Sequence, residues 1–473
     1  MIGSSTLIAH AQIAREPGSF RDPSGFVYRR DGVLYRQIQR SFATDWDDLV
    51  ASGLLATLQT RRMLVDHDLV DTELGADPGT AHAVLRPTVV AFISYPYEWS
   101  FGQLRDAALL TLQAQATAAA AGFTLRDATA YNVQFHQGRP ILIDTLSFER
   151  AKEGAPWAAY KQFCEHFLAP LALMAHRDVR LGLMLRDHLD GIPLDLAATL
   201  LPGKTRLNLG LASHIHAHAK AQAHYADAGA AASDKATGRK LSPFQQAALL
   251  DSLQRTVTGL SWEPSGTEWA DYAEHTSYGD DAAARKDALV ESLLAAAGGS
   301  VVWDMGANTG RFSRIAAKLG RRVVSWDIDP AATERHYRLI RRDGTTSTLP
   351  LVVDLGNPSP ALGWAHTERK SLVDRADADL VLALALIHHL AISRNLPLDR
   401  LADFFADLAP ALIIEFVPKG DPMVDKLLAT REDIFPDYTL DGFRAAFGRR
   451  FEIQEEQPIE GVTRVLFRLT SRP

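Results

Sequence analysis

The stretch Val301-Val302-Trp303-Asp304-Met305-Gly306-Ala307-Asn308-Thr309-Gly310 decides the fold of the C-terminal half of the chain. It begins as a short apolar run, which is typical of a buried parallel strand. It then turns at Asp304, Gly306 and Gly310 into residues 311–319, where apolar side chains recur at helical spacing. A strand, a glycine-rich turn and a helix in this order predict an open α/β sheet whose turn offers backbone N–H groups to a nucleotide-like ligand.

The residues of this turn separate two kinds of ligand. A dinucleotide fingerprint reads G-x-G-x-x-G/A, but Asn308 stands where its second glycine belongs and Arg311 stands at the third position. Asp304, just before the loop, would repel a pyrophosphate and attract an ammonium group. The pattern D-x-G-x-N-x-G closely resembles the first motif of class I S-adenosylmethionine (SAM) methyltransferases. This resemblance implies SAM as the cofactor, bound by Asp304, Gly306, Asn308 and Gly310. The alternatives are a dinucleotide site and a purely structural turn.

Two further strand ends carry acidic residues that suit the same ligand. Asp327 ends the apolar run 322–326, and its two carboxylate oxygens could accept hydrogen bonds from both ribose hydroxyls, with Ile328 at the edge of the pocket. Asp354 follows the run 349–353 and could accept a hydrogen bond from the adenine amino group, with Leu355 against the ring. The spacing from Asp304 to Asp327 suits one strand–helix–strand unit.

Polar residues also follow the fourth and fifth predicted strands. His388 and His389 end the apolar run 379–387, and ligands of open sheets bind beyond the carboxyl ends of the strands. A neutral histidine there could take a proton from a hydroxyl or amine nucleophile, or it could only orient the loop. Glu415, in the fifth strand, is a third candidate catalytic residue. Tyr278 precedes the helix predicted over 281–297 and is a candidate cofactor contact, with aromatic packing as the alternative.

The predicted strands of this half are 301–305, 322–327, 349–356, 379–390 and 411–418, with 451–453 and 463–470 as a closing antiparallel pair. Together they predict a Rossmann-like seven-stranded sheet of the SAM methyltransferase type.

The N-terminal half opens with a predicted β-hairpin over 25–38, in which two strand-forming runs flank Asp31-Gly32. A helix over 44–64, a strand over 84–94 interrupted at Pro87, and a long helix over 101–121 follow. The stretch after them resembles the catalytic segment of protein-kinase-like phosphotransferases. By that resemblance Asp127 would be the base, and Asn132 and Asp144 would be metal ligands.

Several departures make this kinase-like domain degenerate. Leu125 stands where kinases carry a histidine, no G-x-G-x-x-G loop is present, and Arg36 is the only basic residue well placed as the strand cation. We therefore predict no metal site unless Asn132 and Asp144 are active. ATP-dependent phosphoryl transfer in the N-terminal domain is the alternative function.

Composition narrows the class of protein. The chain has 473 residues, a hydrophobic share of 47%, a charged share of 23% and a net charge of −7. This negative net charge provides no overall basic field for a nucleic acid and argues against a nucleic-acid partner. A single cysteine, Cys164, suits the reducing cytoplasm, and no apolar run is long enough to span a membrane. We expect an α/β and α+β multidomain protein with a kinase-like domain at 1–200, a helical or flexible linker at 201–265 and a methyltransferase domain at 266–473.

The chain as a whole resembles the nodulation-type (NoeA-like) methyltransferases. The segments that carry the resemblance are 94–100, 127–135, 143–148, 162–170 and 190–195. It implies methyl transfer to a small-molecule or glycan-type acceptor, which the N-terminal domain would bind or present. The sequence predicts neither the attacked atom nor the oligomeric state.

Overall fold

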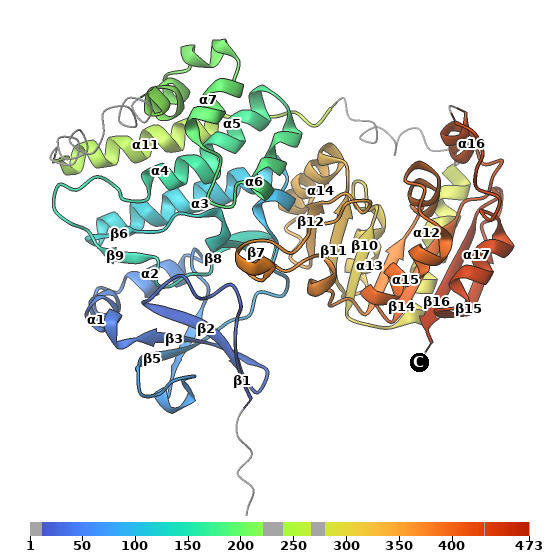
Figure 1. Ribbon diagram of the computed structural model, residues 1–473, viewed down its shortest axis with the longest axis horizontal. Helices are drawn as coiled ribbons and strands as arrows, with labels where there is room; N and C mark the ends of the chain where they lie inside the picture. The colour runs from blue at the N-terminus through green and yellow to red at the C-terminus, as the bar shows by residue number, and fades with distance from the viewer. Residues whose placement is uncertain (1–11, 221–239, 266–279, 430, 473) are drawn as a thin grey trace, which may run out of the picture.

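The computed structural model describes residues 12–220, 240–265, 280–429 and 431–472. Two units are visible in Figure 1: residues up to 265 lie on the left, and most residues from 280 lie on the right, with one orange segment reaching to β7. The candidate cofactor contact Tyr278 lies outside the described residues.

The C-terminal unit is built on a seven-stranded sheet with the order β12-β11-β10-β13-β14-β16-β15. The pairs from β12 to β14 are parallel, whereas β16 is antiparallel to both of its neighbours. The predicted sheet, including its closing antiparallel pair, is therefore confirmed. Its strands are β10 (Val301–Met305), β11 (Arg322–Asp327), β12 (Thr348–Val352), β13 (Leu380–Ala383), β14 (Ala411–Phe416), β15 (Phe451–Pro458) and β16 (Val465–Ser471).

Helices cover both faces of this sheet. Apolar side chains of α12 and α13 form one buried cluster with β10, β11, β13 and β14. Side chains of α14, α15 and α17 belong to a second and larger cluster. The unit is thus a three-layer α/β/α arrangement. Its helices are α12 (Asp280–Ala297), α13 (Arg311–Lys318), α14 (Pro330–Asp343), α15 (Leu398–Leu408), α16 (Pro422–Leu428) and α17 (Leu440–Phe447).

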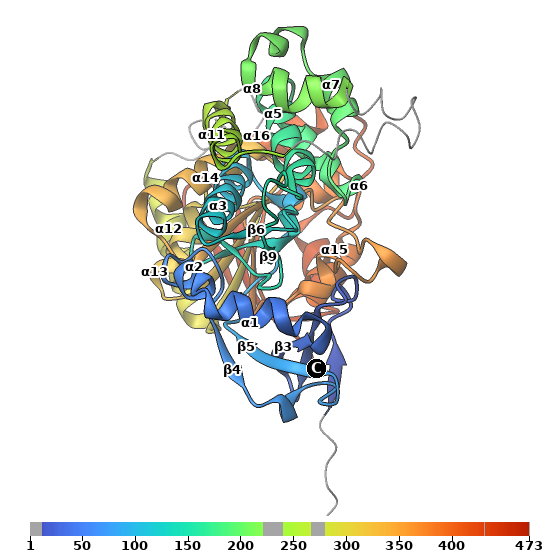
Figure 2. The same ribbon diagram turned by 90° about the vertical axis from the view of Figure 1, so that its left-hand side faces the viewer.

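The N-terminal unit combines a five-stranded antiparallel sheet of order β1-β2-β3-β5-β4 with a helical part (Figure 2). The predicted hairpin is confirmed as β2 paired with β3, and both of its turn residues, Asp31 and Gly32, have positive φ. The strands are β1 (Ile13–Arg15), β2 (Gly25–Arg30), β3 (Val33–Gln39), β4 (His67–Val70), β5 (Ala81–Pro87), β6 (Phe123–Leu125), β7 (Val133–His136), β8 (Arg139–Leu142) and β9 (Phe148–Arg150).

The helical part is centred on α3 (Phe101–Ala120), whose start is fixed by a capping box of Ser100 and Gln103. Within the stretch 201–265, expected to be a helical or flexible linker, α11 (Pro243–Gly259) packs against α3. The remaining helices are α1 (Ala43–Ala51), α2 (Leu54–Thr60), α4 (Tyr160–Phe163), α5 (Ala169–His176), α6 (Met184–Asp187), α7 (Leu194–Leu200) and α8 (Leu209–Leu211), with π-helices η5 (Cys164–Leu168) and η8 (Ala212–Ala217).

The strand expected over 84–94 is β5, which begins at Ala81 and ends at Pro87. Two further predicted elements differ from the observed ones. The single helix expected over 44–64 is broken into α1 and α2 at Gly53, whose φ of 72° lies in the left-handed region. The strand expected over 379–390 ends at Ala383, and a π-helix, η12 (His389–Ser393), follows it. In both places local backbone geometry overrides the apolar pattern, which alone cannot distinguish a long strand from a strand followed by a turn.

The two units share one continuous buried core. Phe92 packs edge-on against Trp303 and Trp326 of the C-terminal sheet. The fully buried carboxylate of Glu98 forms a bidentate ion pair with Arg375 at 2.5 and 2.9 Å, and it accepts a hydrogen bond from Ser359 at 2.6 Å. The aromatic segment 95–101 is therefore part of this seam between units.

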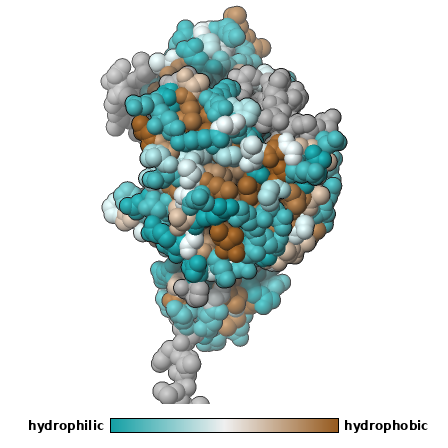
Figure 3. Space-filling view, turned by 90° about the vertical axis from the view of Figure 1, so that its right-hand side faces the viewer, coloured by the Kyte–Doolittle hydropathy of each residue, from teal (hydrophilic) through white to brown (hydrophobic). Residues whose placement is uncertain are grey.

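Single apolar side chains are exposed on the C-terminal unit, among them Ile328, Trp364 and Ile434. The face shown in Figure 3 is largely hydrophilic, with apolar residues in separate patches. Within the described ranges, every helix is too short or too polar to cross a lipid bilayer.

Candidate functional site

The strand order places a ligand crevice at the carboxyl ends of β10 and β13. From β10 the chain proceeds outward through β11 and β12, then returns to β13 on the other side of β10. Such a reversal of strand order leaves a crevice outside the strand ends, where open α/β sheets bind ligands. The glycine-rich turn and the histidine pair both lie at this edge.

The glycine-rich turn is tightly held to β11. The N–H groups of Gly306 and Ala307 both donate to the carbonyl oxygen of Trp326, at 2.8 and 3.0 Å. Gly306, Asn308 and Gly310 have φ values of 77°, 50° and 76°. These left-handed positions explain the glycines and the asparagine, because other side chains are strained there.

Asp327 ends β11 and fastens the turn from the other side. Its carboxylate accepts hydrogen bonds from the N–H groups of Asn308 at 2.7 Å and Asp329 at 2.8 Å. Burial raises the pKa of Asp327 to about 6, with further upward contributions from the charges of Asp329 and Asp304. Each oxygen uses one lone pair on an N–H group, so each keeps acceptor capacity for a ligand hydroxyl.

Asp304 lies beneath the turn. It is 1% exposed, and its carboxylate accepts a hydrogen bond from the Ser313 hydroxyl at 2.5 Å. Burial raises the pKa of Asp304 to about 6, although Ser313 and the charge of Lys286 oppose the shift. The position of this carboxylate means that it would act on a ligand through its field and through the loop rather than by direct contact.

The predicted adenine contacts are more open. Ile328 is 45% exposed at the pocket edge, and Leu355 is half-buried after β12. Asp354 is engaged within the chain: its oxygens accept hydrogen bonds from the guanidinium of Arg394 at 2.6 Å and the N–H of Gly356 at 2.8 Å. Arg394 was not singled out from the sequence, and an adenine amino group would share Asp354 with it.

The histidine pair follows β13 in an unusual backbone. Ala385 has a φ of 52°, and η12 begins at His389. The rings of His388 and His389 are 4.1 Å apart between centroids. Burial lowers the pKa of His388 well below its ordinary value and that of His389 to about 4. Both imidazoles are therefore neutral near pH 7.

Glu415 is held in a buried charge cluster beside the histidines. Its carboxylate pairs with Lys286 of α12 at 2.5 Å, and Arg464 lies 3.7 Å away. Arg464 in turn binds both oxygens of Asp421, at 2.7 and 3.0 Å. Lys286 and Arg464 could not be singled out from the sequence, because their partners are far away along the chain. A catalytic role for Glu415 stays a prediction.

His336 of α14 is a further residue that sequence reasoning missed. A Cβ atom at Gly310 would lie 2.1 Å from the His336 ring, so only glycine fits against it. Both ring nitrogens of His336 are buried without a hydrogen-bond partner in the described structure. Burial lowers the pKa of His336 to about 3. A lone histidine in a charged helix carries no sequence signal for this position.

The three predicted kinase-like residues also come together. Ser147 bridges Asn132 and Asp144, donating to Asp144 at 2.5 Å and accepting from Asn132 at 3.2 Å. Arg36 forms an ion pair with the same carboxylate. Burial is the largest single influence on Asp144 and would raise its pKa. The charge of Arg36 and the hydrogen bonds from Ser147, Leu146 and Arg36 together outweigh burial and hold the pKa below its ordinary value. Burial raises the pKa of Asp127.

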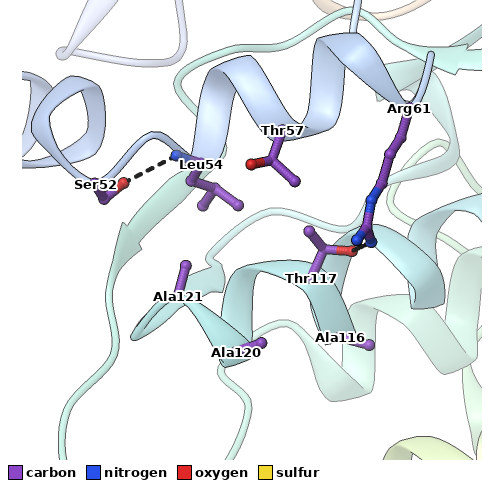
Figure 4. Close-up of a pocket in the computed structure, with 8 residues that line it drawn as sticks. All are labelled: Ser52, Leu54, Thr57, Arg61, Ala116, Thr117, Ala120 and Ala121. Carbon is purple, nitrogen blue, oxygen red and sulfur yellow. Dashed lines mark hydrogen bonds between the residues drawn. The ribbon is translucent and has the colours of Figure 1, made fainter.

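A separate groove of about 400 Å³ lies between α2 and α3 (Figure 4). Arg61 reaches across it to the Thr117 hydroxyl at 3.5 Å. The other lining residues are small or uncharged: Ser52, Leu54, Thr57, Ala116, Ala120 and Ala121. The groove offers no acid–base pair and lies away from the crevice of the C-terminal sheet.

The fold defines a doubly wound α/β protein with buried carboxylates, Asp304 and Asp327, at the carboxyl ends of two neighbouring strands. No family model matches the chain. The nodulation protein NoeA of Rhizobium meliloti (strain 1021) is 35% identical over 478 residues, which cover 99% of this chain and 98% of that protein. The chain therefore belongs to the NoeA family.

Solved structures give weaker similarities. The bifunctional kinase-methyltransferase WbdD has a TM-score of 0.29 and 16% identity over 45% of each chain. Magnesium protoporphyrin IX methyltransferase (ChlM) from Synechocystis PCC 6803, with bound SAH, has a TM-score of 0.31 and 17% identity, over 43% of this chain and 94% of its own. N-methyltransferase NodS from Bradyrhizobium japonicum WM9 has a TM-score of 0.30 and 13% identity, over 41% of this chain and 98% of its own. Similarities this low carry no argument about fold or function.

Proposed function

We propose that this chain is a SAM-dependent methyltransferase. The observation that carries the proposal is Asp327, an acid at the tip of β11 that holds the glycine-rich turn through backbone N–H groups and keeps acceptor capacity. The partners of Asp304 and Asp327 in the described structure are hydroxyl and N–H groups rather than cations. A crevice with this surplus of negative charge suits a cationic, phosphate-free adenosyl ligand better than a dinucleotide.

The residues present fit SAM. Asp327 would bind the ribose hydroxyls, Ile328 and Leu355 would contact the adenine ring, and Asp354 would accept from its amino group. The left-handed turn at Gly306, Asn308 and Gly310 would lie against the methionine part, with the field of Asp304 beneath it. Tyr278 remains a proposed contact. When bound, SAM supplies an activated methyl group, and the protein aligns the acceptor with it and excludes water.

The acceptor is proposed to be a small molecule or glycan, with the N-terminal unit binding or presenting it. The shared core and the Glu98–Arg375 pair support a joint role, because they fix the N-terminal unit against the sheet that carries the crevice. We do not propose phosphoryl transfer, since the charge of Asp144 is already matched by Arg36.

Incubation of the protein with methyl-labelled SAM and a small-molecule cell extract tests the proposal. We expect labelled product from the native protein and none from Asp327→Ala. Asp379→Asn is a matched control, because Asp379 binds backbone N–H groups at the opposite end of β13. Equal labelling by native protein and Asp327→Ala would contradict the proposed site.

A further inference from the structure

The corner formed by the ends of β13 and β14 adjoins the glycine-rich turn directly. Leu386 lies 3.3 Å from the position of a Cβ atom at Gly306, so the segment that leads to His388 packs on the turn. Ala385 in this segment is left-handed although it is not glycine, and a π-helix follows. Strained residues and π-helical turns are frequent at functional sites. This corner therefore has the unusual backbone geometry of a functional site, independently of the acidic residues at the other strand ends.

His388 is the most unusual group of the corner. Its side chain is fully buried, and neither ring nitrogen has a hydrogen-bond partner within the described part of the chain. Buried polar atoms are nearly always hydrogen-bonded, so two unpartnered nitrogens on one ring require an explanation. A neutral imidazole has one N–H donor and one bare nitrogen acceptor. A ligand group that carries its own O–H or N–H would satisfy the bare nitrogen.

The charges around this imidazole argue against an anionic ligand. The two buried cations of the corner already have carboxylate partners, Lys286 with Glu415 and Arg464 with Asp421. Asp304 and Asp327 add negative charge across the crevice. A carboxylate or phosphate placed here would lose its hydration without gaining a counter-charge from these pairs. An uncharged acceptor avoids that cost.

We infer that the methyl acceptor is an uncharged group with a transferable proton, a hydroxyl or a neutral amine or amide, and that His388 receives this proton. The inference rests on the proposed function and narrows its substrate class. The acceptor oxygen or nitrogen gives a lone pair to the methyl carbon. The carbon–sulfur bond breaks, and its electron pair stays on sulfur, which becomes an uncharged thioether. The acceptor proton moves to His388 and then to solvent. The His388 side chain is fully buried in this structure, so this proton transfer requires the side chains that cover it to move when the acceptor binds.

The chemical nature of the labelled product tests the substrate class. The native protein is incubated with methyl-labelled SAM and a small-molecule extract, and the products are treated with mild alkali. A methyl ester of a carboxylate releases labelled methanol, whereas a methyl ether or an N-methyl group keeps the label. Fragmentation in a mass spectrometer identifies a methyl phosphate. Label retained on an ether oxygen or nitrogen supports the inference, and label on a carboxylate or phosphate overturns it while leaving the proposed function intact. No labelled product at all overturns both.

Two variants test the role of His388. In His388→Phe, label transfer should fall by about 100-fold, the low end of a general base's contribution. Its affinity for SAM by calorimetry should stay within about 3-fold, since binding and proton transfer are separate roles. His214→Phe is the control for loss of a buried imidazole, because His214 is hydrogen-bonded to Tyr160 and Ser252 away from the crevice. Transfer that falls equally in both variants, or not at all in His388→Phe, would contradict the assignment.

Discussion

The two acidic clusters of this molecule use the same residue type in opposite electrostatic settings. In the N-terminal unit, Asp144 is paired with Arg36, and its pKa is held below the ordinary value. In the C-terminal unit, Asp304 and Asp327 accept from hydroxyl and N–H groups, and burial raises the pKa of each to about 6. In the N-terminal cluster Arg36 balances the charge of Asp144, whereas the hydrogen-bond donors to Asp304 and Asp327 in the described structure are uncharged groups.

This difference shows why motif residues alone do not define a site. Asp127, Asn132 and Asp144 converge as the kinase resemblance implies, yet Arg36 of β3 pairs with Asp144 and balances the charge of that carboxylate, which lowers its attraction for a metal ion. The strand-tip acids are costly to bury at neutral pH, and a cationic ligand would recover that cost. The predictions below test each side of this contrast.

The largest effect on stability is expected at the Glu98–Arg375 ion pair, in which both side chains are almost completely buried. Arg375→Met leaves Glu98 without its counter-ion at the seam between units. The free energy of unfolding should fall by about 3–5 kcal/mol, measured by urea denaturation. Arg21→Met is the control, because Arg21 pairs with Glu368 across the same seam but is 66% exposed. Its cost should stay below about 1 kcal/mol. A small effect of Arg375→Met would contradict a large contribution of this ion pair to stability.

The next largest effect concerns SAM affinity and the strand-end carboxylates of the C-terminal unit. Asp327→Ala removes the acceptor that holds the turn and, by the proposal, the ribose. The dissociation constant for SAM should rise by at least about 100-fold, or about 2.7 kcal/mol, in calorimetry. Asp379→Asn, at the far end of the sheet, should leave the affinity unchanged. An unchanged affinity in Asp327→Ala would refute the site.

Arg36→Met removes the cation that pairs with Asp144 in the N-terminal unit. It leaves the Asp144 carboxylate mostly buried without a cation, so unfolding should become easier by about 2 kcal/mol, less than at the fully buried seam. The double variant Arg36→Met/Asp144→Leu should recover most of this loss, because no buried charge is then left without a partner.

We also expect Mg-ATP to leave the melting temperature of the native protein unchanged. A clear stabilisation by Mg-ATP would restore the phosphotransferase alternative.

The smallest effect is a pH dependence. Because Asp304 and Asp327 have folded-state pKa values of about 6, above their ordinary 3.8, the folded protein binds more protons than the unfolded chain between these values. The stability of the unliganded protein should therefore fall as pH rises from about 4 to about 6. SAM affinity should change oppositely, strengthening by about 10-fold between pH 5 and 7.5 as the carboxylates ionise. Calorimetry on native protein and Asp327→Asn measures it, and an equal slope in both would exclude Asp327 as the source.

The sheet and the glycine-rich turn could be predicted because their signals are local. Apolar runs, the left-handed positions Gly306 and Gly310, and acids at strand ends all lie within short windows. The same holds for the hairpin turn at Asp31-Gly32. The predicted helix and strand boundaries were wrong where left-handed backbone geometry interrupts an apolar run, as at Gly53 and Ala385.

The partners of the site residues could not be predicted. Arg394 binds Asp354 from 40 residues away, and Lys286 binds Glu415 from 129 residues away. Only the folded chain brings these charged groups together. Their pairing determines which carboxylates have a cationic partner and which do not. The environment of His388 depends in the same way on packing. Within the described residues its ring nitrogens have no hydrogen-bond partner, and only the folded structure shows this.

The central claim is that the strand-tip acids bind a cationic, phosphate-free adenosyl ligand. Parallel calorimetric titrations with SAM and with NAD at pH 7.5 test it most directly. The account predicts saturable one-to-one binding of SAM in the micromolar range and no heat of binding with NAD. Binding of NAD without binding of SAM, or no binding of either, would contradict it.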